Sequence, residues 1–139
     1  MAKKFSISLL AEEFIGEANG VYTAFLEAKD ALDKNKNVTT FLNEKFKEAN
    51  IIHAHSIGVQ CLWLSYFHKK KMVVSAHVVP DSFIGSLIFS RLWQPLAKLY
   101  LKWVFSRAAL VIAVSPVVKE ELTKIGVSSR IEVLCNSVD

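Results

Sequence analysis

The sequence predicts an α/β fold with a doubly wound, mostly parallel sheet of about six strands and helices on both faces. Short apolar segments rich in β-branched residues alternate with longer segments of helical periodicity along the chain. Strands buried on both faces have this composition. Two of these strands lead into histidines, within residues 50–56 and 72–77, so imidazoles are expected at the carboxyl edge of the sheet, where open α/β folds bind ligands.

The first half of the chain contains three predicted strands and three predicted helical segments. In chain order these are the strand 5–10, the helix 21–34, the strand 38–41, a brief helix 43–49, the strand 51–54 and the helix 57–68. The strands are short and apolar, and the helices carry apolar residues at spacings of three and four. Asn19 and Gly20 precede the first helix, which ends in the polar run 33–37.

The second half continues the alternation. Its elements are the strand 72–76, a long helical element 84–105, the strand 109–114, the helix 116–125 and the strand 131–134. Pro95 is expected to break or kink the long element. Ser115, Pro116 and Gly126 fit the N-cap, the first position and the C-terminal glycine of the next helix. With right-handed crossovers between parallel strands, this order predicts a Rossmann-like architecture.

Length and composition indicate one domain over residues 1–139. No apolar run approaches the ~18 residues of a membrane-spanning helix. The apolar stretch 5–10 meets Glu12 and Glu13 without a small-residue cleavage site, so it is interpreted as a strand and not as a signal peptide. Cys61 and Cys135 have no metal-site spacing and are expected to be free thiols in the cytoplasm.

The positive charge is unevenly distributed. The formal net charge is +4, and no acidic residue lies between Asp81 and Glu120. Aromatic and basic residues alternate in the long helical element of this region, where Trp93, Lys98, Lys102 and Trp103 suit a face for a membrane or a protein partner. A covering helix with its aromatics on the sheet and its lysines in water gives the same pattern. No nucleic-acid partner is predicted.

Several common site motifs are absent. The chain has no G-x-G-x-x-G run, no phosphate-binding loop that ends in Lys-Ser or Lys-Thr, and no G-x-S-x-G elbow. Gly20, at the start of the first helix, is expected either to let backbone amides and the positive helix end meet an anionic phosphate or to be an ordinary loop glycine. A zinc site from His53, His55 and His77 is disfavoured, because no carboxylate or cysteine stands at a companion position, and no metal is expected.

The motifs in combination resemble the N-terminal domain of the family 4 retaining glycosyltransferases of the GT-B fold. The resemblance spans nearly the whole chain and rests on five segments in the same order, residues 19–21, 50–56, 73–77, 107–115 and 131–139. It implies the acceptor-side domain of an enzyme that transfers a sugar from a nucleotide-diphosphate sugar to a saccharide or lipid acceptor. No cofactor beyond that co-substrate is implied.

The resemblance also implies roles for individual residues. Gly20 matches the family glycine that lies against the donor diphosphate, and Asn19 replaces the glycine before it. Asparagine tolerates the positive φ that such a turn needs. His77 matches the histidine that faces the reacting centre, where preorganised donors stabilise the departing phosphate.

Three further residues are expected on the acceptor side. His55 and Ser56 follow the strand next to that of His77, and both would line the acceptor. Asp81 is close in sequence to His77 and would orient that ring or a sugar hydroxyl.

The end of the chain resembles the segment that connects the family's N-terminal domain to its C-terminal domain. Residues 136–139, Asn-Ser-Val-Asp, resemble the family's Asn-Gly-Val-Asp, with Ser137 in place of the glycine. The resemblance implies a C-terminal domain that binds the nucleotide. A separate gene is one source of that domain. The chain alone is then expected to be inactive, cytoplasmic and peripheral on the inner face of the membrane. A second interpretation stays open: a non-catalytic, truncated binding module that associates with anionic membrane or with a protein partner.

Overall fold

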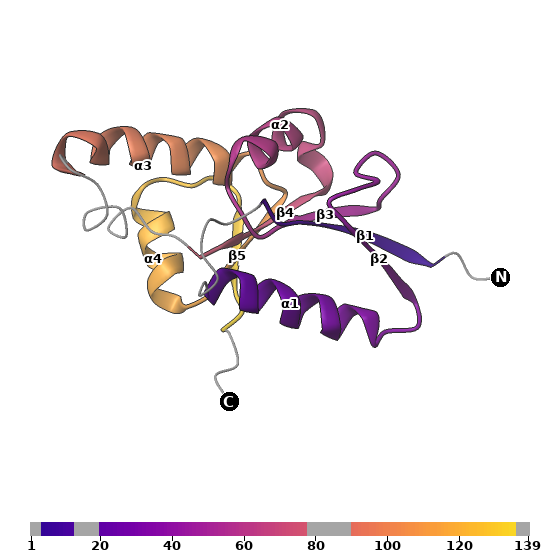
Figure 1. The fold of residues 1–139 in the computed structure, drawn as a ribbon. Helices are drawn as coiled ribbons and strands as arrows, with labels where there is room; N and C mark the ends of the chain where they lie inside the picture. Colours follow the sequence, from indigo (N-terminus) through magenta and orange to yellow (C-terminus); the bar gives the residue numbers. More distant parts are fainter. Residues whose placement is uncertain (1–3, 13–19, 78–89, 136–139) are drawn as a thin grey trace.

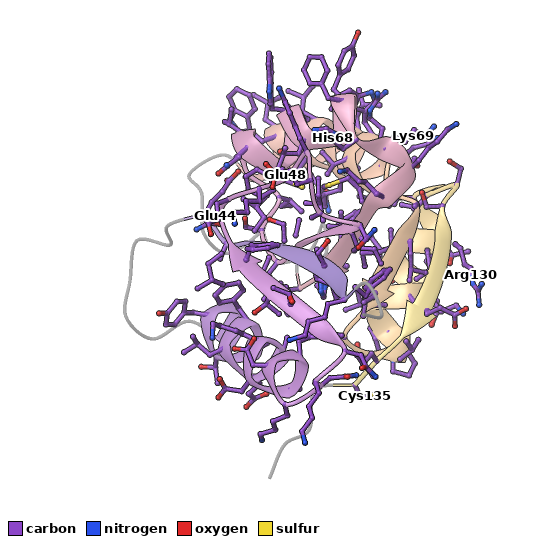
Figure 2. The ribbon with its side chains drawn as sticks, turned by 90° about the vertical axis from the view of Figure 1, so that its right-hand side faces the viewer. Glu44, Glu48, His68, Lys69, Arg130 and Cys135 are labelled. Atoms are coloured by element: carbon purple, nitrogen blue, oxygen red, sulfur yellow. The ribbon has the colours of Figure 1, made fainter. Side chains whose placement is uncertain are left out.

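Six parallel strands form one sheet in the order β2-β1-β3-β4-β5-β6 (Figure 1). The computed structural model describes residues 4–12, 20–77 and 90–135. The strands are β1 (Phe5–Leu10), β2 (Val38–Leu42), β3 (Ile51–Ala54), β4 (Met72–Ala76), β5 (Leu110–Ala113) and β6 (Arg130–Val133). All six agree with the predicted strands to within a residue or two at each end. Figure 2 shows Arg130 on the strand that forms one edge of the sheet.

Helices cover both faces of the sheet, as predicted. They are α1 (Gly20–Asp33), α2 (Val59–Phe67), α3 (Ser90–Ser106) and α4 (Pro116–Lys124), with a 3-10 turn at Lys69–Lys71. In Figure 1, α1 lies on one side of the sheet and α2 and α3 lie on the other. The α/β, Rossmann-like fold class is therefore confirmed.

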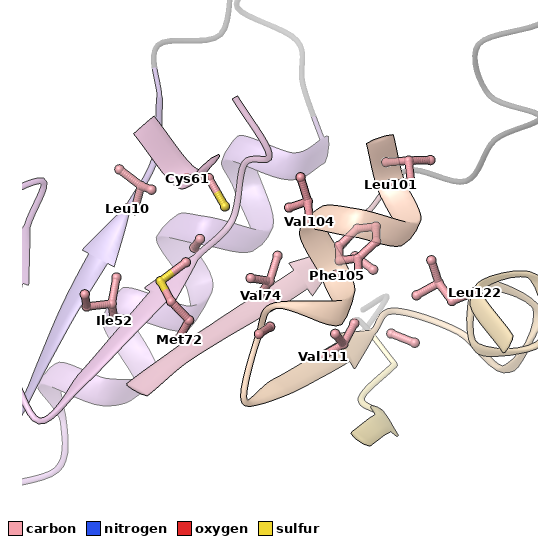
Figure 3. Close-up of a cluster of buried hydrophobic side chains, with 14 of the residues drawn as sticks. Leu10, Ile52, Cys61, Met72, Val74, Leu101, Val104, Phe105, Val111 and Leu122 are labelled. Atoms are coloured by element: carbon pink, nitrogen blue, oxygen red, sulfur yellow. The ribbon is translucent and has the colours of Figure 1, made fainter. Parts of the chain in front are cut away.

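The core lies between the sheet and the helices α2 to α4 (Figure 3). Alternate residues of the central strands point into it, because successive side chains of a strand face opposite sides. Sheet residues Leu10, Ile52, Met72, Val74 and Val111 and helix residues Cys61, Leu101, Val104, Phe105 and Leu122 are all fully buried there. The residues between them on the strands, His53 and Ser75 included, face the side that α1 covers.

The direction of the chain changes between β1 and β3. From β1 the chain crosses to β2 on one side, whereas β3, β4, β5 and β6 follow one another on the other side. The loops that leave the carboxyl ends of β1 and β3 diverge at such a switch point, and ligands of open α/β sheets bind in that crevice. Leu9 pairs with His53 and Leu10 with Ala54, so both strands end level with each other.

The brief helix predicted over residues 43–49 is wrong. Asn43 and Lys45 have positive φ angles of 51° and 54°, which a right-handed helix excludes. The side-chain Oδ1 of Asn43 accepts a 2.9 Å hydrogen bond from the Ala11 backbone amide, and its Nδ2 donates a 3.0 Å hydrogen bond to the Ala11 carbonyl. Lys71 Nζ donates to three carbonyls of the same segment, those of Phe46, Lys47 and Ala49. These tertiary bonds satisfy the backbone without a helix.

Of the break or kink expected at Pro95, the break does not occur, since α3 continues through that residue to Ser106. Its predicted start at residue 84 lies outside the described residues. The caps of α4 are confirmed: Ser115 Oγ accepts a 3.2 Å hydrogen bond from the Val118 amide, and Gly126 follows the helix with a φ of 86°. In the parts of the chain that are described, no helix combines the length and apolarity needed to cross a bilayer.

Candidate functional site

Three imidazole rings meet at the carboxyl ends of β3 and β4. The ring centroids of His53 and His55 are 4.2 Å apart, and those of His55 and His77 are 6.0 Å apart with planes 28° from parallel. Residues 53, 55 and 77 have this arrangement because odd-numbered residues of both strands face the side of α1. We call these three residues the histidine cluster.

His53 is the structural member of the cluster. Its Nε2 lies 2.8 Å from Ser75 Oγ on the neighbouring strand, so the two side chains satisfy each other. Burial, followed by the nearby His77, lowers the pKa of His53 from 6.5 to about 4. The ring is neutral at physiological pH and contacts the tilted ring of His55.

His55 lies between α1 and the end of β1, and its side chain is only 4% exposed. The Phe25 ring of α1 meets it edge-on at 5.4 Å, and its backbone amide donates to the Leu10 carbonyl at 3.0 Å. Burial, followed by the neighbouring His53 and His77, lowers its pKa to about 3. Neither ring nitrogen has a hydrogen-bond partner among the described residues.

His77 also has an unpartnered nitrogen. Its Nε2 is buried and has no hydrogen-bond partner in the described part of the chain, and burial lowers its pKa below 6.5. A buried polar atom without a partner is costly, so such an atom is a candidate to hydrogen-bond a ligand. A neutral imidazole has one donor and one acceptor nitrogen. His55 and His77 together therefore match a ligand with hydroxyl or phosphate oxygens, to which they contribute hydrogen bonds and not charge.

Ser56 and Glu12 connect the ends of β1 and β3. Ser56 is buried, and its Oγ accepts a 3.1 Å hydrogen bond from the Glu12 amide. Glu12 Oε1 in turn accepts hydrogen bonds from the amides of Gln60 and Cys61, so the carboxylate caps the positive end of α2. Sequence analysis did not find this cap, because 48 residues separate Glu12 from Gln60 and no local motif marks the pair.

A hollow of about 660 Å³ opens beside this cap, next to the switch point. Its lining residues come from the ends of β1 and β2 and from the first turns of α2. They are Ala11, Glu12, Asn43, Val59, Gln60 and Trp63. The described residues contain no group of three histidine, cysteine, aspartate or glutamate side chains placed to hold a metal ion.

The six-stranded parallel sheet with helices on both faces is consistent with the family that the chain matches by sequence. The family model described as Glycosyltransferase Family 4 matches residues 22–139. The chain belongs to glycosyltransferase family 4. No curated protein matches the chain. The predicted family is thereby confirmed, and the activity is that of a glycosyltransferase domain.

The family 4 match includes His55, Ser56 and His77 but begins two residues after Gly20. Gly20 is the first residue of α1, five residues before Phe25, which contacts His55. At 1.5 Å per residue, the start of α1 is about 7.5 Å along the helix axis from that contact. The role of Gly20 at a phosphate stays a prediction, and Asn19 and Asp81 lie outside the described residues.

The predicted membrane or partner face of the family 4 domain is exposed but divided. Lys98 and Lys102 line a hollow of about 410 Å³ between α3 and α4, where Glu121 and Lys124 also lie. Trp103 is 42% exposed and lies on the side of α3 that faces α2. Trp93 is 55% exposed. Lys98 and Lys102 therefore line a different hollow from Trp103.

Proposed function

We propose that this domain is the acceptor-side half of an enzyme that transfers a sugar, with retention, from a nucleotide-diphosphate sugar to a saccharide or lipid acceptor. The observation that carries the proposal is the stacked pair His55 and His77, both with unpartnered ring nitrogens, at the carboxyl edge of a parallel sheet. Sugar hydroxyls and phosphate oxygens are the ligands that such neutral imidazoles hydrogen-bond. Family membership supplies the reaction class.

Sugar transfer requires hydrogen-bond donors that are in place before the bond to the leaving group breaks. As the anomeric carbon gains positive charge, the departing diphosphate gains negative charge, and fixed hydrogen-bond donors stabilise it. A neutral His77 donates such a bond without repelling the cationic carbon. In this proposal His77 is the catalytic residue.

The proposal assigns the remaining predicted residues to the two substrates. It gives His55, Ser56 and Asp81 to the acceptor, and Gly20 and Asn19 to the donor diphosphate. A C-terminal domain of the same fold class binds the nucleotide, and no further cofactor takes part. We place the enzyme in the cytoplasm, with peripheral contact to the inner face of the membrane.

The chain alone provides the first test. Uridine diphosphate and guanosine diphosphate are titrated separately into the protein, and the carbon-bound ring protons of each histidine are followed by NMR. Signals of His55 and His77 are expected to shift, whereas those of His68, on the far end of α2, stay in place. Titration with uridine, which lacks the diphosphate, is the control. Equal shifts of all four histidines, or shifts of His68 alone, would contradict the proposal.

The assembled enzyme provides the second test. The chain is combined with the nucleotide-binding half of a family 4 glycosyltransferase, and release of nucleoside diphosphate from the sugar donor is measured. His77→Ala is expected to lower the rate about 100-fold, the scale of losing one preorganised donor. The matched variant His68→Ala leaves the rate unchanged. Equal rates for wild type and His77→Ala would remove His77 from its catalytic role.

The non-catalytic alternative predicts different results in both tests. A truncated binding module shows no nucleotide-dependent shift of the histidine cluster and no turnover in the assembled enzyme, but it still binds its membrane or protein partner. The exposed aromatic side chains of α2 and α3 are the observation that keeps this alternative in view.

A further inference from the structure

Two hollows adjoin each other along α2. The first is the hollow of about 660 Å³ beside Glu12 at the switch point, and the second has a volume of about 700 Å³. Gln60 and Trp63 line both hollows, so the two meet at these side chains. The second hollow reaches Phe67, about 10 Å along the helix axis from Gln60. We call the two hollows together the α2 groove.

The opposite wall of the α2 groove is the turn over residues 43–49, which lies beside α2 (Figure 1). The Asn43 side chain is bonded to the Ala11 backbone, and Lys71 Nζ donates to three carbonyls of the turn. Both hollows have volumes within the range of about 300–1,000 Å³ that is typical of ligand sites. A wall fixed in this way loses little conformational entropy when a ligand binds.

Trp63 is the aromatic centre of the α2 groove. It is 66% exposed, and its ring centroid lies 4.8 Å from that of Phe67, with the ring planes at 54°. An exposed tryptophan offers a flat apolar face beside a polar N–H edge. A sugar ring has the complementary form, because its C–H groups make an apolar face and its hydroxyls form a polar rim. Trp63 is therefore suited to stack on a sugar ring.

Polar side chains border Trp63 in both hollows. Glu12 and Gln60 line the first hollow, and Lys47 and Glu48 line the second. Carboxylates accept hydrogen bonds, an ammonium donates them and an amide does both, so these groups match sugar hydroxyls, which also donate and accept. An acyl chain would desolvate the same groups without replacing their hydrogen bonds. The lining therefore favours a saccharide over a lipid tail.

We infer that the α2 groove binds an oligosaccharide, with one sugar ring stacked on Trp63 and neighbouring rings in the hollows beside Glu12 and Lys47. The inference rests on the proposed function, whose acceptor it narrows from a saccharide or lipid to an oligosaccharide. The groove starts next to the predicted acceptor residue Ser56, whose Oγ accepts a hydrogen bond from the Glu12 amide. Helix α2 runs from the end of β3 back toward the start of β4. An oligosaccharide whose end reacts at the histidine cluster thus extends along α2, away from the carboxyl edge of the sheet.

Direct binding to the chain tests the class of ligand. The protein is applied to an array of immobilised oligosaccharides built from hexose, hexosamine, deoxyhexose and uronate residues, and the tightest ligand is titrated by calorimetry. Its monosaccharide is expected to bind at least about tenfold more weakly, because a single ring fills only part of the groove. Dihexanoylphosphatidylcholine, which has acyl chains and no sugar, should leave the Trp63 indole signal in NMR unshifted. Absence of binding to every oligosaccharide overturns the inference, as does a shift of that signal by the lipid alone.

Matched variants locate the binding. Trp63→Ala is expected to lower the affinity for the tightest oligosaccharide at least about tenfold, the scale of losing an aromatic hot spot. Trp93→Ala removes a tryptophan of α3 that is 55% exposed, and it leaves the affinity unchanged. Lys47→Ala weakens binding by a smaller factor, whereas Lys36→Ala, on an exposed lysine after α1, has no effect. Equal affinities of wild type and Trp63→Ala, or equal losses in the two tryptophan variants, contradict the inference. Circular dichroism verifies that each variant is folded.

The outcome for the α2 groove is separate from that for the transferase proposal, because no sugar nucleotide enters these assays. Oligosaccharide binding without turnover in the assembled enzyme would contradict the transferase proposal and retain the groove as a saccharide site. Nucleotide-dependent shifts of His55 and His77 in a chain that binds no oligosaccharide would overturn the groove alone.

Discussion

Glu12 and Gly58 lie so close together that no side chain fits between them. A Cβ atom at position 58 would be 1.3 Å from Glu12 Oε2. The backbone of Gly58 has a φ of −76°, which any residue adopts, so a side chain at position 58 is opposed by the Glu12 carboxylate and not by the backbone conformation. The contact lets the carboxylate reach the amides at the start of α2 and joins the loops after β1 and β3 at the switch point.

Gly58→Ala is therefore expected to destabilise the fold by displacing the Glu12 carboxylate from α2. The loss is about 1–2 kcal/mol, the usual cost of losing a helix cap. Because both substitutions remove the same hydrogen bonds, Glu12→Ala/Gly58→Ala should cost no more than Glu12→Ala alone. Urea unfolding of the four members of this double-mutant cycle measures the coupling.

Gly126→Ala provides the matched comparison. Gly126 has a φ of 86°, so a side chain there is strained by about 1 kcal/mol. It lies beside Lys102 and far in sequence from Glu12, so its effect should add to that of Glu12→Ala. Additivity at position 58 as well would show that Glu12 and Gly58 do not act together.

The histidine cluster predicts that the protein loses stability in mild acid. The pKa of His55 is about 3 in the fold against 6.5 in the unfolded chain, so between these values the unfolded state binds a proton that the folded state excludes. Stability is fully present above pH 6.5 and falls as the pH decreases toward 3. At pH 5 the loss from His55 is about 2 kcal/mol. Urea unfolding at pH 7.5 and pH 5.0 measures it.

His55→Leu tests the source of this pH dependence. The variant loses stability at both pH values through altered packing, but the difference between pH 7.5 and pH 5.0 should shrink by about 2 kcal/mol. His68→Ala removes a ring that lies near the surface. This variant should preserve most of the wild-type difference in unfolding free energy between pH 7.5 and pH 5.0. An unchanged difference in His55→Leu would mean that His55 is not buried as a neutral ring.

Lys71 is predicted to hold the turn over residues 43–49. Its ammonium donates to three carbonyls, and burial lowers its pKa below 10.5. Lys71→Met is expected to cost about 1.5–3 kcal/mol, the range for hydrogen bonds to a charged group. Amide exchange in residues 43–49 should become faster, while the neighbouring variant Lys70→Met, on an exposed side chain, leaves exchange there unchanged.

Phe105 is predicted to be the most sensitive position of α3. It is fully buried beneath the helix and is the largest of the fully buried side chains in the described residues. Phe105→Ala is expected to cost about 3–5 kcal/mol through lost burial and the cavity that remains. Leu99→Ala, on the same helix but 63% exposed, should change the free energy of unfolding by less than about 1 kcal/mol.

The sequence alone determined the elements whose signals are local. Six strands followed from apolar, β-branched runs, and the ends of α4 followed from Ser115, Pro116 and Gly126, because capping and periodicity act over a few residues. The arrival of His55 and His77 at one edge also followed, since strands joined by helices are parallel and end on the same side.

Tertiary structure decided what depends on partners far apart in the chain. The turn over residues 43–49 replaces a helix because Asn43 and Lys71 bond to backbone from other segments, and Glu12 caps a helix 48 residues away. The Arg107 guanidinium contacts the Tyr66 ring of α2 and the Trp103 ring of α3, because the two helices lie side by side. Periodicity indicates that a helix has apolar residues, but only tertiary packing decides which of its sides is buried and which stays exposed.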